Sequence, residues 1–321
     1  MNRSFKNLVA PAVLGLLLAA PAVGYSQQSP VTGAIYGYNT FAAPSGGSVV
    51  SQGFVKNSVY SGAVTVSGST FLATGITVNS LAPTAYSDRP NAPRYYVEIT
   101  TGAYAGTSYD VESNDSNGIT VFGLPGDLNG QSNIVIAVRP HYTLGDLANA
   151  STGLSTFTDT FTLYQGNNSQ SSYYFSGNGV VGGDYLTPES QTVLYPGTGA
   201  LLNNSGNATF TVSGLVKTNQ TVVPVYAGVN LLAPVDPSGT TSMTSENLAL
   251  ILQPYSDSVS LVATDGSLAT TPFYSDGSQL LDQNYAPLNP AGAPVVAVGN
   301  GFFVNTSQNG LWTNLKILTS Y

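Results

Sequence analysis

The stretch Arg94-Tyr-Tyr-Val-Glu-Ile-Thr100 decides the fold class. Tyr, Val and Ile occupy alternate positions from residue 95 and share one face of an extended chain, while Glu98 lies on the other face. We therefore expect a strand that is buried on one side. A second stretch, Asn133-Ile-Val-Ile-Ala-Val138, is apolar on both faces. That pattern is typical of a strand in the middle of a sandwich or barrel.

The chain beyond residue 28 continues in the same way, with short apolar or alternating runs separated by Gly, Asn, Ser, Asp and Pro. The 35 Gly and 19 Pro favour turns, and the abundant Thr, Val and Tyr favour strands. Helical periodicity is nearly absent. The sequence predicts an all-β protein with two β-sandwich or barrel-like domains of short antiparallel strands, and one or two short helices.

The two candidate helices are Thr143-Leu-Gly-Asp-Leu-Ala-Asn149 and Thr244-Ser-Glu-Asn-Leu-Ala-Leu-Ile-Leu252. Each begins with Thr, which can cap a helix, and has an acidic residue in its first turn, where the helix dipole favours negative charge. Each also follows a strong strand and a proline-containing turn. This similar order fits an internal duplication and fits a chance likeness equally well.

The first 26 residues have the layout of a secretory signal peptide. Arg3 and Lys6 precede an apolar stretch that ends at small residues. A membrane anchor is the alternative, but Pro11 and Pro21 interrupt the stretch, and its unbroken part is shorter than the ~20 residues that a bilayer requires. We expect residues 1–26 to be removed, and the protein to be exported to the cell envelope, the cell surface or the extracellular medium.

A change in composition between residues 145 and 183 predicts the start of a second domain. Asn- and Ser-rich pieces alternate there with aromatic ones, which recur too often to remain in water. We expect an N-terminal β domain over residues 27–153 and a C-terminal β domain over residues 154–321.

The charge of the chain excludes several partners and kinds of site. Only 7 % of the residues are charged, and the formal net charge is −8, so no basic stripe is present to neutralise nucleic-acid phosphates. The absence of Cys and the single His exclude thiolate zinc sites, iron–sulfur clusters and sites built from several imidazoles. No segment after the signal peptide is long and apolar enough to span a membrane as a helix.

One acidic cluster could hold a metal ion. The stretch Asp110-Val-Glu-Ser-Asn-Asp-Ser-Asn-Gly118 places Asp110, Glu112 and Asp115 close together, and carboxylate oxygens are the ligands that Ca²⁺ prefers. The alternative is a β-hairpin turn, because the stretch lies between two expected strands and lacks the Glu that closes an EF-hand loop. Apart from this possible calcium ion, we expect no cofactor.

Tyrosine is the abundant residue type that could bind a ligand, with 20 in the chain. Its ring can stack on a sugar face while its hydroxyl stays in water. Core or sheet-surface packing explains many of these tyrosines, because they lie within expected strands. Four lie around Asn- and Ser-rich loops and are the candidates for a carbohydrate-contacting patch: Tyr164, Tyr173, Tyr174 and Tyr185.

No catalytic motif is recognisable. A glycosidase needs a pair of carboxylates, and none of the acidic residues lies in such a motif. A nucleophile elbow and a P-loop are also absent. His141 is the single imidazole that could act as a base, but its place beside a proline at a strand end favours a structural role. We expect no enzymatic activity.

Several stretches act as landmarks along most of the mature chain. They are Arg94-Tyr-Tyr-Val-Glu-Ile-Thr-Thr-Gly102, Ile136-Ala-Val-Arg-Pro-His-Tyr-Thr-Leu144, Leu194-Tyr-Pro-Gly-Thr-Gly199, Val223-Pro-Val-Tyr-Ala-Gly-Val-Asn-Leu-Leu232 and Gly299-Asn-Gly-Phe-Phe-Val304. In this order they resemble a large paralogous family of exported, uncharacterised β-rich proteins known mainly from Verrucomicrobia and related bacteria. The resemblance implies an exported bacterial protein without an assigned activity, and it carries over no catalytic or ligand-binding residue.

Three hypotheses for the function follow. The leading one is a non-enzymatic structural or adhesive β-protein of the cell surface or extracellular matrix, associating with itself, with other envelope proteins or with polysaccharide. Its few charges leave little electrostatic repulsion against such neighbours. The second is a carbohydrate-binding module that uses exposed tyrosines. The third is a hydrolase with a carboxylate pair.

Overall fold

The computed structural model describes residues 35–83, 93–164, 166–167, 169–237, 239–262, 271–297 and 299–314. The predicted signal peptide, residues 1–26, lies outside these ranges. The predicted all-β class is confirmed, since the described residues form antiparallel strands and a single α-helix, α1 (Leu144–Asn149). No helix among the described residues is long and apolar enough to cross a membrane.

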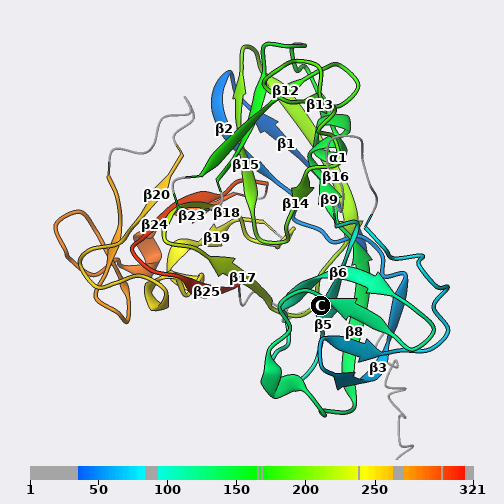
Figure 1. The fold of residues 1–321 in the computed structure, drawn as a ribbon. Helices are drawn as coiled ribbons and strands as arrows, with labels where there is room; N and C mark the ends of the chain where they lie inside the picture. Colours follow the sequence, from blue (N-terminus) through cyan, green and yellow to red (C-terminus); the bar gives the residue numbers. More distant parts are fainter. Residues whose placement is uncertain are drawn as a thin grey trace, which may run out of the picture. The chain divides into compact units, whose positions relative to one another are not determined.

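Six strands form a closed barrel, with the order β3-β4-β7-β6-β5-β8 around its wall (Figure 1). Each neighbouring pair is antiparallel, and a short 3₁₀ helix, η1 (Gly126–Leu128), precedes the last strand. Fully buried Phe71, Ile99, Ile119 and Ile136 fill the interior. The strands are β3 (Tyr60–Ser67), β4 (Thr70–Leu72), β5 (Tyr95–Ile99), β6 (Ser108–Asn114), β7 (Ile119–Val121) and β8 (Ile134–Pro140).

Both stretches that decided the fold class are barrel strands. The stretch from residue 134 is buried along most of its length in β8, as expected. The expectation of one-sided burial for β5 is wrong, because Tyr96 and Glu98 on its polar face are also buried. Tyr96 packs against the ring of His141, and Glu98 pairs with two cationic side chains. The polar face of β5 is thus a second interior surface.

A first module is made of the strands before and after the barrel. One of its sheets has the order β1-β16-β10, and the other has the order β13-β12-β11-β15-β2. A two-stranded pair, β14-β9, accompanies them. The strands are β1 (Tyr36–Ala43), β2 (Gly46–Ser51), β9 (Tyr142–Thr143), β10 (Ser151–Thr152), β11 (Thr160–Tyr164), β12 (Gln170–Phe175), β13 (Val180–Val181), β14 (Val193–Leu194), β15 (Gly199–Asn204) and β16 (Ala208–Leu215).

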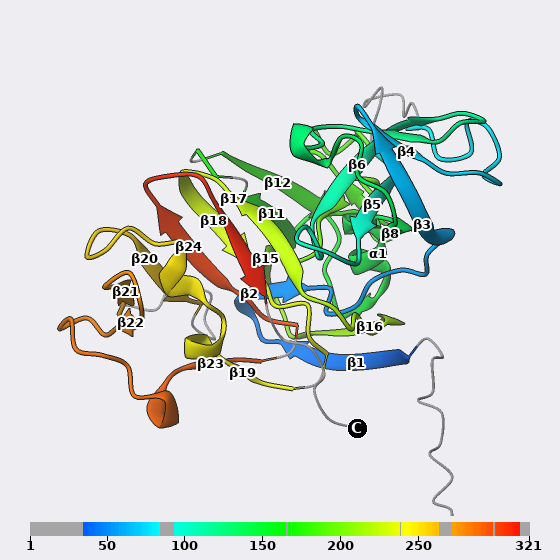
Figure 2. The same cartoon turned by 90° about the horizontal axis from the view of Figure 1, so that it is seen from below.

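A second module follows in the chain and is visible in Figure 2 beside β15. Its sheets are β17-β25, β18-β24-β20, β19-β23 and β21-β22. The elements are β17 (Thr221–Val225), β18 (Gly228–Leu232), β19 (Thr241–Ser242), η2 (Met243–Ser245), η3 (Leu248–Leu250), β20 (Ser258–Leu261), β21 (Tyr274–Ser275), β22 (Leu280–Leu281), η4 (Pro290–Gly292), β23 (Val295–Val296), β24 (Phe302–Thr306) and β25 (Gly310–Asn314).

The second module repeats the pairing of the first. The pairs β1-β16, β2-β15, β15-β11, β14-β9 and β12-β13 correspond to β17-β25, β18-β24, β24-β20, β23-β19 and β21-β22. Side chains repeat as well. Asp159 accepts hydrogen bonds from the Ser155 and Ser205 amides, and Asp257 accepts them from the Gln253 and Ser307 amides. The structure therefore contains an internal repeat, and the barrel is inserted into its first copy.

The two modules pack together through equivalent residues. Val49 and Leu201 of the first module meet Leu231 and Phe303 of the second in a buried apolar cluster. Val49 corresponds to Leu231, and Leu201 corresponds to Phe303, in the aligned strand registers. The contact thus has approximate two-fold symmetry, as in a dimer of identical subunits.

One of the two predicted helices is an α-helix in the structure, and the other is not. The stretch from Thr143 contains α1, whose N-cap Thr143 and Asp146 form a capping box. The stretch from Thr244 contains 3₁₀ turns in place of an α-helix. The boundary at residues 153/154 stays a prediction, and β1 and β2 pair with strands on its C-terminal side.

Candidate binding site

A cavity with a volume of about 590 Å³ lies where the barrel and the two modules meet. We call it the junction pocket. Each of the three parts contributes aromatic side chains to its wall, and Phe122, Tyr195 and Tyr226 are partly open to solvent, with exposed fractions of 52 %, 39 % and 46 %. The aromatic residues are Tyr109 and Phe122 from the barrel, Tyr164 and Tyr195 from the first module, and Tyr226 from the second.

One carboxylate, Asp110 on β6, also lines the junction pocket. The Tyr195 hydroxyl donates a hydrogen bond of 2.7 Å to Asp110 Oδ2, and His141 Nε2 lies 2.9 Å from Oδ1. Burial, together with the neighbouring Asp110 charge, raises the pKa of Tyr195 above its ordinary value, so this hydroxyl remains a donor. Asp110 is therefore held in a fixed orientation with acceptor capacity left toward the pocket.

His141 supports this carboxylate from the interior. The residue is 3 % exposed, and its ring lies 4.9 Å from the Tyr96 ring and 5.2 Å from the Tyr195 ring. Its Nδ1 has no hydrogen-bond partner among the described residues. A Ser-His-Asp triad needs a serine hydroxyl at the second imidazole nitrogen, so this arrangement orients Asp110 without forming such a triad.

The wall of the second module is shaped by the turn between β17 and β18. Asn230 is buried, and its side chain accepts a hydrogen bond from the Tyr226 amide and donates one to the Tyr226 carbonyl. Gly166 of the first module approaches this turn so closely that a Cβ on it would lie 2.3 Å from the Tyr226 Cβ. Its φ of +74° is also one that glycine adopts most readily. The position of Tyr226 therefore depends on contact between the modules.

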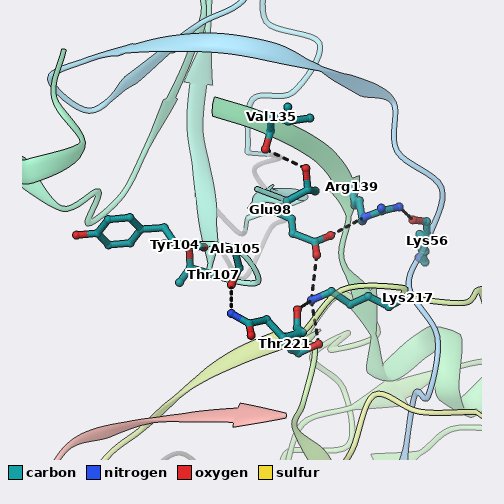
Figure 3. Close-up of polar contacts among 11 residues, drawn as sticks. Lys56, Glu98, Tyr104, Ala105, Thr107, Val135, Arg139, Lys217 and Thr221 are labelled. Carbon is teal, nitrogen blue, oxygen red and sulfur yellow. Dashed lines mark hydrogen bonds and ion pairs between the residues drawn. The ribbon is translucent and has the colours of Figure 1, made fainter. Parts of the chain in front are cut away.

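A buried ionic cluster joins the barrel to the second module (Figure 3). Glu98 Oε2 accepts a hydrogen bond of 3.0 Å from Arg139 Nε, and Glu98 Oε1 lies 2.9 Å from Lys217 Nζ. Burial alone would raise the pKa of Glu98, but the charges and hydrogen bonds of Lys217 and Arg139 outweigh it and keep this pKa below its usual value. Glu98 is thus an ionised carboxylate between two cations.

Lys217 extends this cluster to the strand that forms one pocket wall. Its ammonium donates to the Gln220 carbonyl at 2.7 Å and to the Thr221 hydroxyl at 2.9 Å. The Val222 amide in turn donates to the Gly106 carbonyl of the barrel at 3.0 Å. These contacts fix the start of β17, the strand that leads to Tyr226, against the barrel.

The four predicted ligand-binding tyrosines lie in three different places. Tyr164 lines the junction pocket, and its ring meets the Phe303 ring edge to face at 4.9 Å. Tyr173 is 6 % exposed in the core of the first module, so its burial removes it from any surface patch. Tyr174 and Tyr185 pair with each other, with ring centroids 4.4 Å apart, and line neither described cavity.

The predicted calcium ligands point to different partners. Asp110 faces the junction pocket, Glu112 is exposed, and Asp115 accepts hydrogen bonds from the Asn117 and Gly118 amides. The described residues contain no group of three or more His, Asp or Glu side chains that could hold a metal ion. For Asp115 the observed geometry is that of the hairpin turn, the alternative that the sequence left open.

Sequence reasoning did not identify Tyr109, Phe122, Tyr195 or Tyr226 as site residues. Tyr195 and Tyr226 each lie within two residues of a proline at a strand end, which places their rings at the edge of the sheets. That neighbourhood is the one available sequence signal. Their convergence depends on the pairing of strands far apart in the chain, which a single sequence does not reveal.

The second described cavity is the counterpart of the junction pocket in the internal repeat. It has a volume of about 130 Å³. Five of its lining residues correspond in the repeat to lining residues of the junction pocket: Val49 to Leu231, Leu261 to Leu163, Val262 to Tyr164, Val295 to Val193, and Gly301 to Gly199. We call it the minor pocket. None of the described residues that line it is aromatic or carries a carboxylate.

Comparison of the chain with protein-family models, with curated proteins and with solved structures found no match. The resemblance to the exported verrucomicrobial family therefore stays a prediction. Any functional conclusion has to come from the geometry of this chain.

Proposed function

We propose that the protein is an exported, non-catalytic carbohydrate-binding protein that holds a neutral saccharide in the junction pocket. The observation that carries this proposal is the convergence of four tyrosines, one phenylalanine and one oriented carboxylate on a cavity of about 590 Å³. A pocket of this size, with apolar walls and few polar groups, is typical of small-ligand sites.

The chemistry of the wall supports a saccharide. Tyrosine presents an apolar ring for the C–H face of a sugar and a hydroxyl for its polar edge. Asp110 supplies a charged acceptor for a sugar hydroxyl, and hydrogen bonds to charged groups are the stronger ones. The described residues of the junction-pocket wall include no Lys or Arg, so they offer no cation to an acidic sugar.

The same wall argues against the hydrolase hypothesis. Both glycosidase mechanisms use two carboxyl groups on opposite sides of the scissile bond. Among the described residues, Asp110 is the single carboxylate that lines the junction pocket, and no carboxylate lines the minor pocket. Both oxygens of Asp110 already have partners that hold its position. We therefore assign Asp110 to binding.

Calorimetric titration of the mature protein with neutral and uronic-acid oligosaccharides tests the proposal. We expect at least one neutral oligosaccharide to bind. Tyr226→Ala should lower the affinity about 5- to 50-fold, because it removes one aromatic contact and the free energy of the apolar area that this contact buries. Tyr38→Ala is the matched control, because Tyr38 is also exposed but lies on β1 and lines neither pocket. Binding of acidic sugars alone, or equal affinities for both variants, would contradict the proposal.

A structural or adhesive role at the cell surface remains the second candidate, and the geometry of β1 favours it. β1 is an edge strand of its sheet, and Tyr36 and Tyr38 on it are 61 % and 78 % exposed. Edge strands offer unpaired backbone groups to another chain. Cell fractionation tests this role, which predicts recovery in the envelope or matrix fraction, whereas recovery only in the soluble periplasm argues against it.

A further inference from the structure

The first module exposes a cluster of three aromatic rings that line neither cavity. The Tyr185 ring lies 4.4 Å from the Tyr174 ring and 6.0 Å from the Phe157 ring. Phe157 and Tyr185 are 48 % and 45 % exposed. We call these three residues the first platform.

The second module repeats this cluster with Tyr255, Tyr274 and Tyr285, which we call the second platform. The Tyr285 ring lies 5.0 Å from the Tyr274 ring and 5.9 Å from the Tyr255 ring. Tyr255 and Tyr285 are 59 % and 49 % exposed. The backbone contacts match as well, because the amide of Tyr285 donates to the Asp282 carbonyl just as that of Tyr185 donates to the Gly182 carbonyl, each at 3.0 Å. The two platforms are therefore equivalent sites.

The platform residues have an unusual backbone. Phe157, Tyr185, Tyr255 and Tyr285 have φ angles between +57° and +61°. Bulky residues rarely adopt this left-handed region, where Gly and Asn are favoured, and such strain persists where the surroundings impose it. Folding alone would favour Gly or Asn at all four positions.

The platform positions are aromatic in both copies of the internal repeat. At the pockets two aromatic positions have diverged, because Tyr164 and Tyr195 of the junction pocket correspond to Val262 and Ala297. The retained pair Asp159 and Asp257 is explained by its hydrogen bonds to two loops. Phe157, Tyr185, Tyr255 and Tyr285 pack against other platform rings and are still 45–59 % exposed.

We propose that the two platforms are a matched pair of stacking surfaces for the sugar rings of one neutral polysaccharide, which the chain thereby binds bivalently. The class of ligand rests on the proposed function, whereas the two sites rest on the repeated platforms. A repeating polymer is the occupant that presents the same chemistry to two equivalent sites. Linking two weak sites in this way raises the overall affinity by about 10²- to 10⁴-fold when both engage one polymer.

The charges beside the platforms favour a neutral polymer. Asp184 precedes Tyr185, and hydrogen bonds from the side chain and amide of Thr187 and the amide of Leu186 lower the pKa of Asp184 to about 2. Asp276 and Asp282 occur in the corresponding loops of the second module. An ionised carboxylate beside a stacking surface repels a polyanion.

Retention of the mature protein on insoluble neutral polysaccharides, namely cellulose, chitin, xylan and β-1,3-glucan, tests the proposal. We expect each of Tyr185→Asn and Tyr285→Asn to weaken retention about tenfold or more, because either change removes bivalency, and we expect the double variant to lose it. Asn tolerates the left-handed backbone, so the thermal unfolding midpoint of these variants should stay close to that of the wild type. Leu311→Asn is the control, because Leu311 on β25 is 60 % exposed and lies outside both platforms and both pockets, and this variant should be retained like the wild type.

Equal retention of the wild type and the double variant, or no retention of the wild type on any of these polymers, overturns the proposal. A change of oligomeric state in the double variant, measured by light scattering, also overturns it and assigns the platforms to contact between copies. Titration with short oligosaccharides separates this proposal from the previous one. Platform variants should keep that binding, and Tyr226→Ala should lose it.

Discussion

The junction pocket and the minor pocket are formed by equivalent strands of the internal repeat. They differ in the side chains on these strands and in the presence of the barrel. Equivalent residues of the repeat line both, but Tyr164 and Tyr195 of the first correspond to Val262 and Ala297 of the second. The barrel adds Asp110 and two rings to the junction pocket alone. The junction pocket, with a volume of about 590 Å³, is accordingly larger than the minor pocket, with about 130 Å³. A repeated frame thus makes two cavities, and an inserted barrel turns one of them into a candidate site.

The barrel can act in this way because it is rigidly attached. An ionic cluster joins Glu98 and Arg139 of the barrel to Lys217, which precedes β17. All three side chains are buried. Such clusters add little net stability when complete, but removing one partner leaves a buried charge without its counter-ion. Single substitutions can weaken this attachment or change the difference between the two pockets.

The largest effect is expected from Lys217→Met. It leaves the carboxylate of Glu98 buried with one cation and should lower the free energy of unfolding by about 3–5 kcal/mol, as measured by urea denaturation. Lys56→Met is the matched control. Lys56 forms a partly exposed ion pair of 2.7 Å with Asp146, whose loss should cost about 0–1 kcal/mol. Equal losses in the two variants would show that the cluster does not attach the barrel.

The stability contribution of Glu98 should depend on pH. Its pKa is lowered in the folded protein, so its contribution is complete above the unfolded value of about 4.3 and is lost as the pH falls through the folded value. The free energy of unfolding of the wild type should therefore fall more steeply below about pH 4.3 than that of Glu98→Gln. Glu112→Gln, which changes an exposed carboxylate, should follow the wild type. Identical slopes for all three proteins would contradict this account.

Gly166→Ala tests the contact between the modules at the pocket wall. The new methyl group would meet the Tyr226 side chain, so the variant should lose about 1–3 kcal/mol more stability than Gly68→Ala and should bind oligosaccharide more weakly. Gly68 is the control because it has a similar positive φ but open space around it. Equal stabilities in thermal denaturation would mean that the wall can shift freely.

The smallest effect is expected from Val262→Tyr. This change gives the minor pocket the ring that Tyr164 gives the junction pocket, yet the barrel still contributes nothing there. Calorimetric titration should therefore detect no second saccharide site in the variant. A second site of similar affinity would show that the rings suffice without Asp110 and the barrel.

Much of the fold could be predicted from local pattern. Alternation in the stretch from residue 95 and the apolar run from residue 134 identified two real strands, and Thr143 and Asp146 identified the start of α1. The sequence left open whether the strands form a sandwich or a barrel, because closure of the barrel pairs β3 with β8, which are far apart in the chain. The sequence left an internal duplication and a chance likeness equally open, because the barrel separates β2 from β9 and the two copies are therefore not aligned along the chain.

The candidate site was predicted less completely. Tyr164 was identified, but Tyr195 and Tyr226 reach the pocket only through pairing between distant strands. The alternating pattern of the strand predicted that Glu98 faces solvent, but Glu98 is buried. Its burial is possible because two cations from distant segments of the chain pair with its carboxylate. Local rules failed where the barrel meets the modules, and a functional site is where such failures are expected.

A crystal structure of the mature protein with its tightest-binding neutral oligosaccharide tests the central claim most directly. We predict electron density for a sugar ring in the junction pocket, against the rings of Tyr164, Tyr195 or Tyr226 and with a hydroxyl donating to Asp110. The minor pocket should contain no sugar. An oligosaccharide bound elsewhere while the junction pocket holds only solvent would contradict the account.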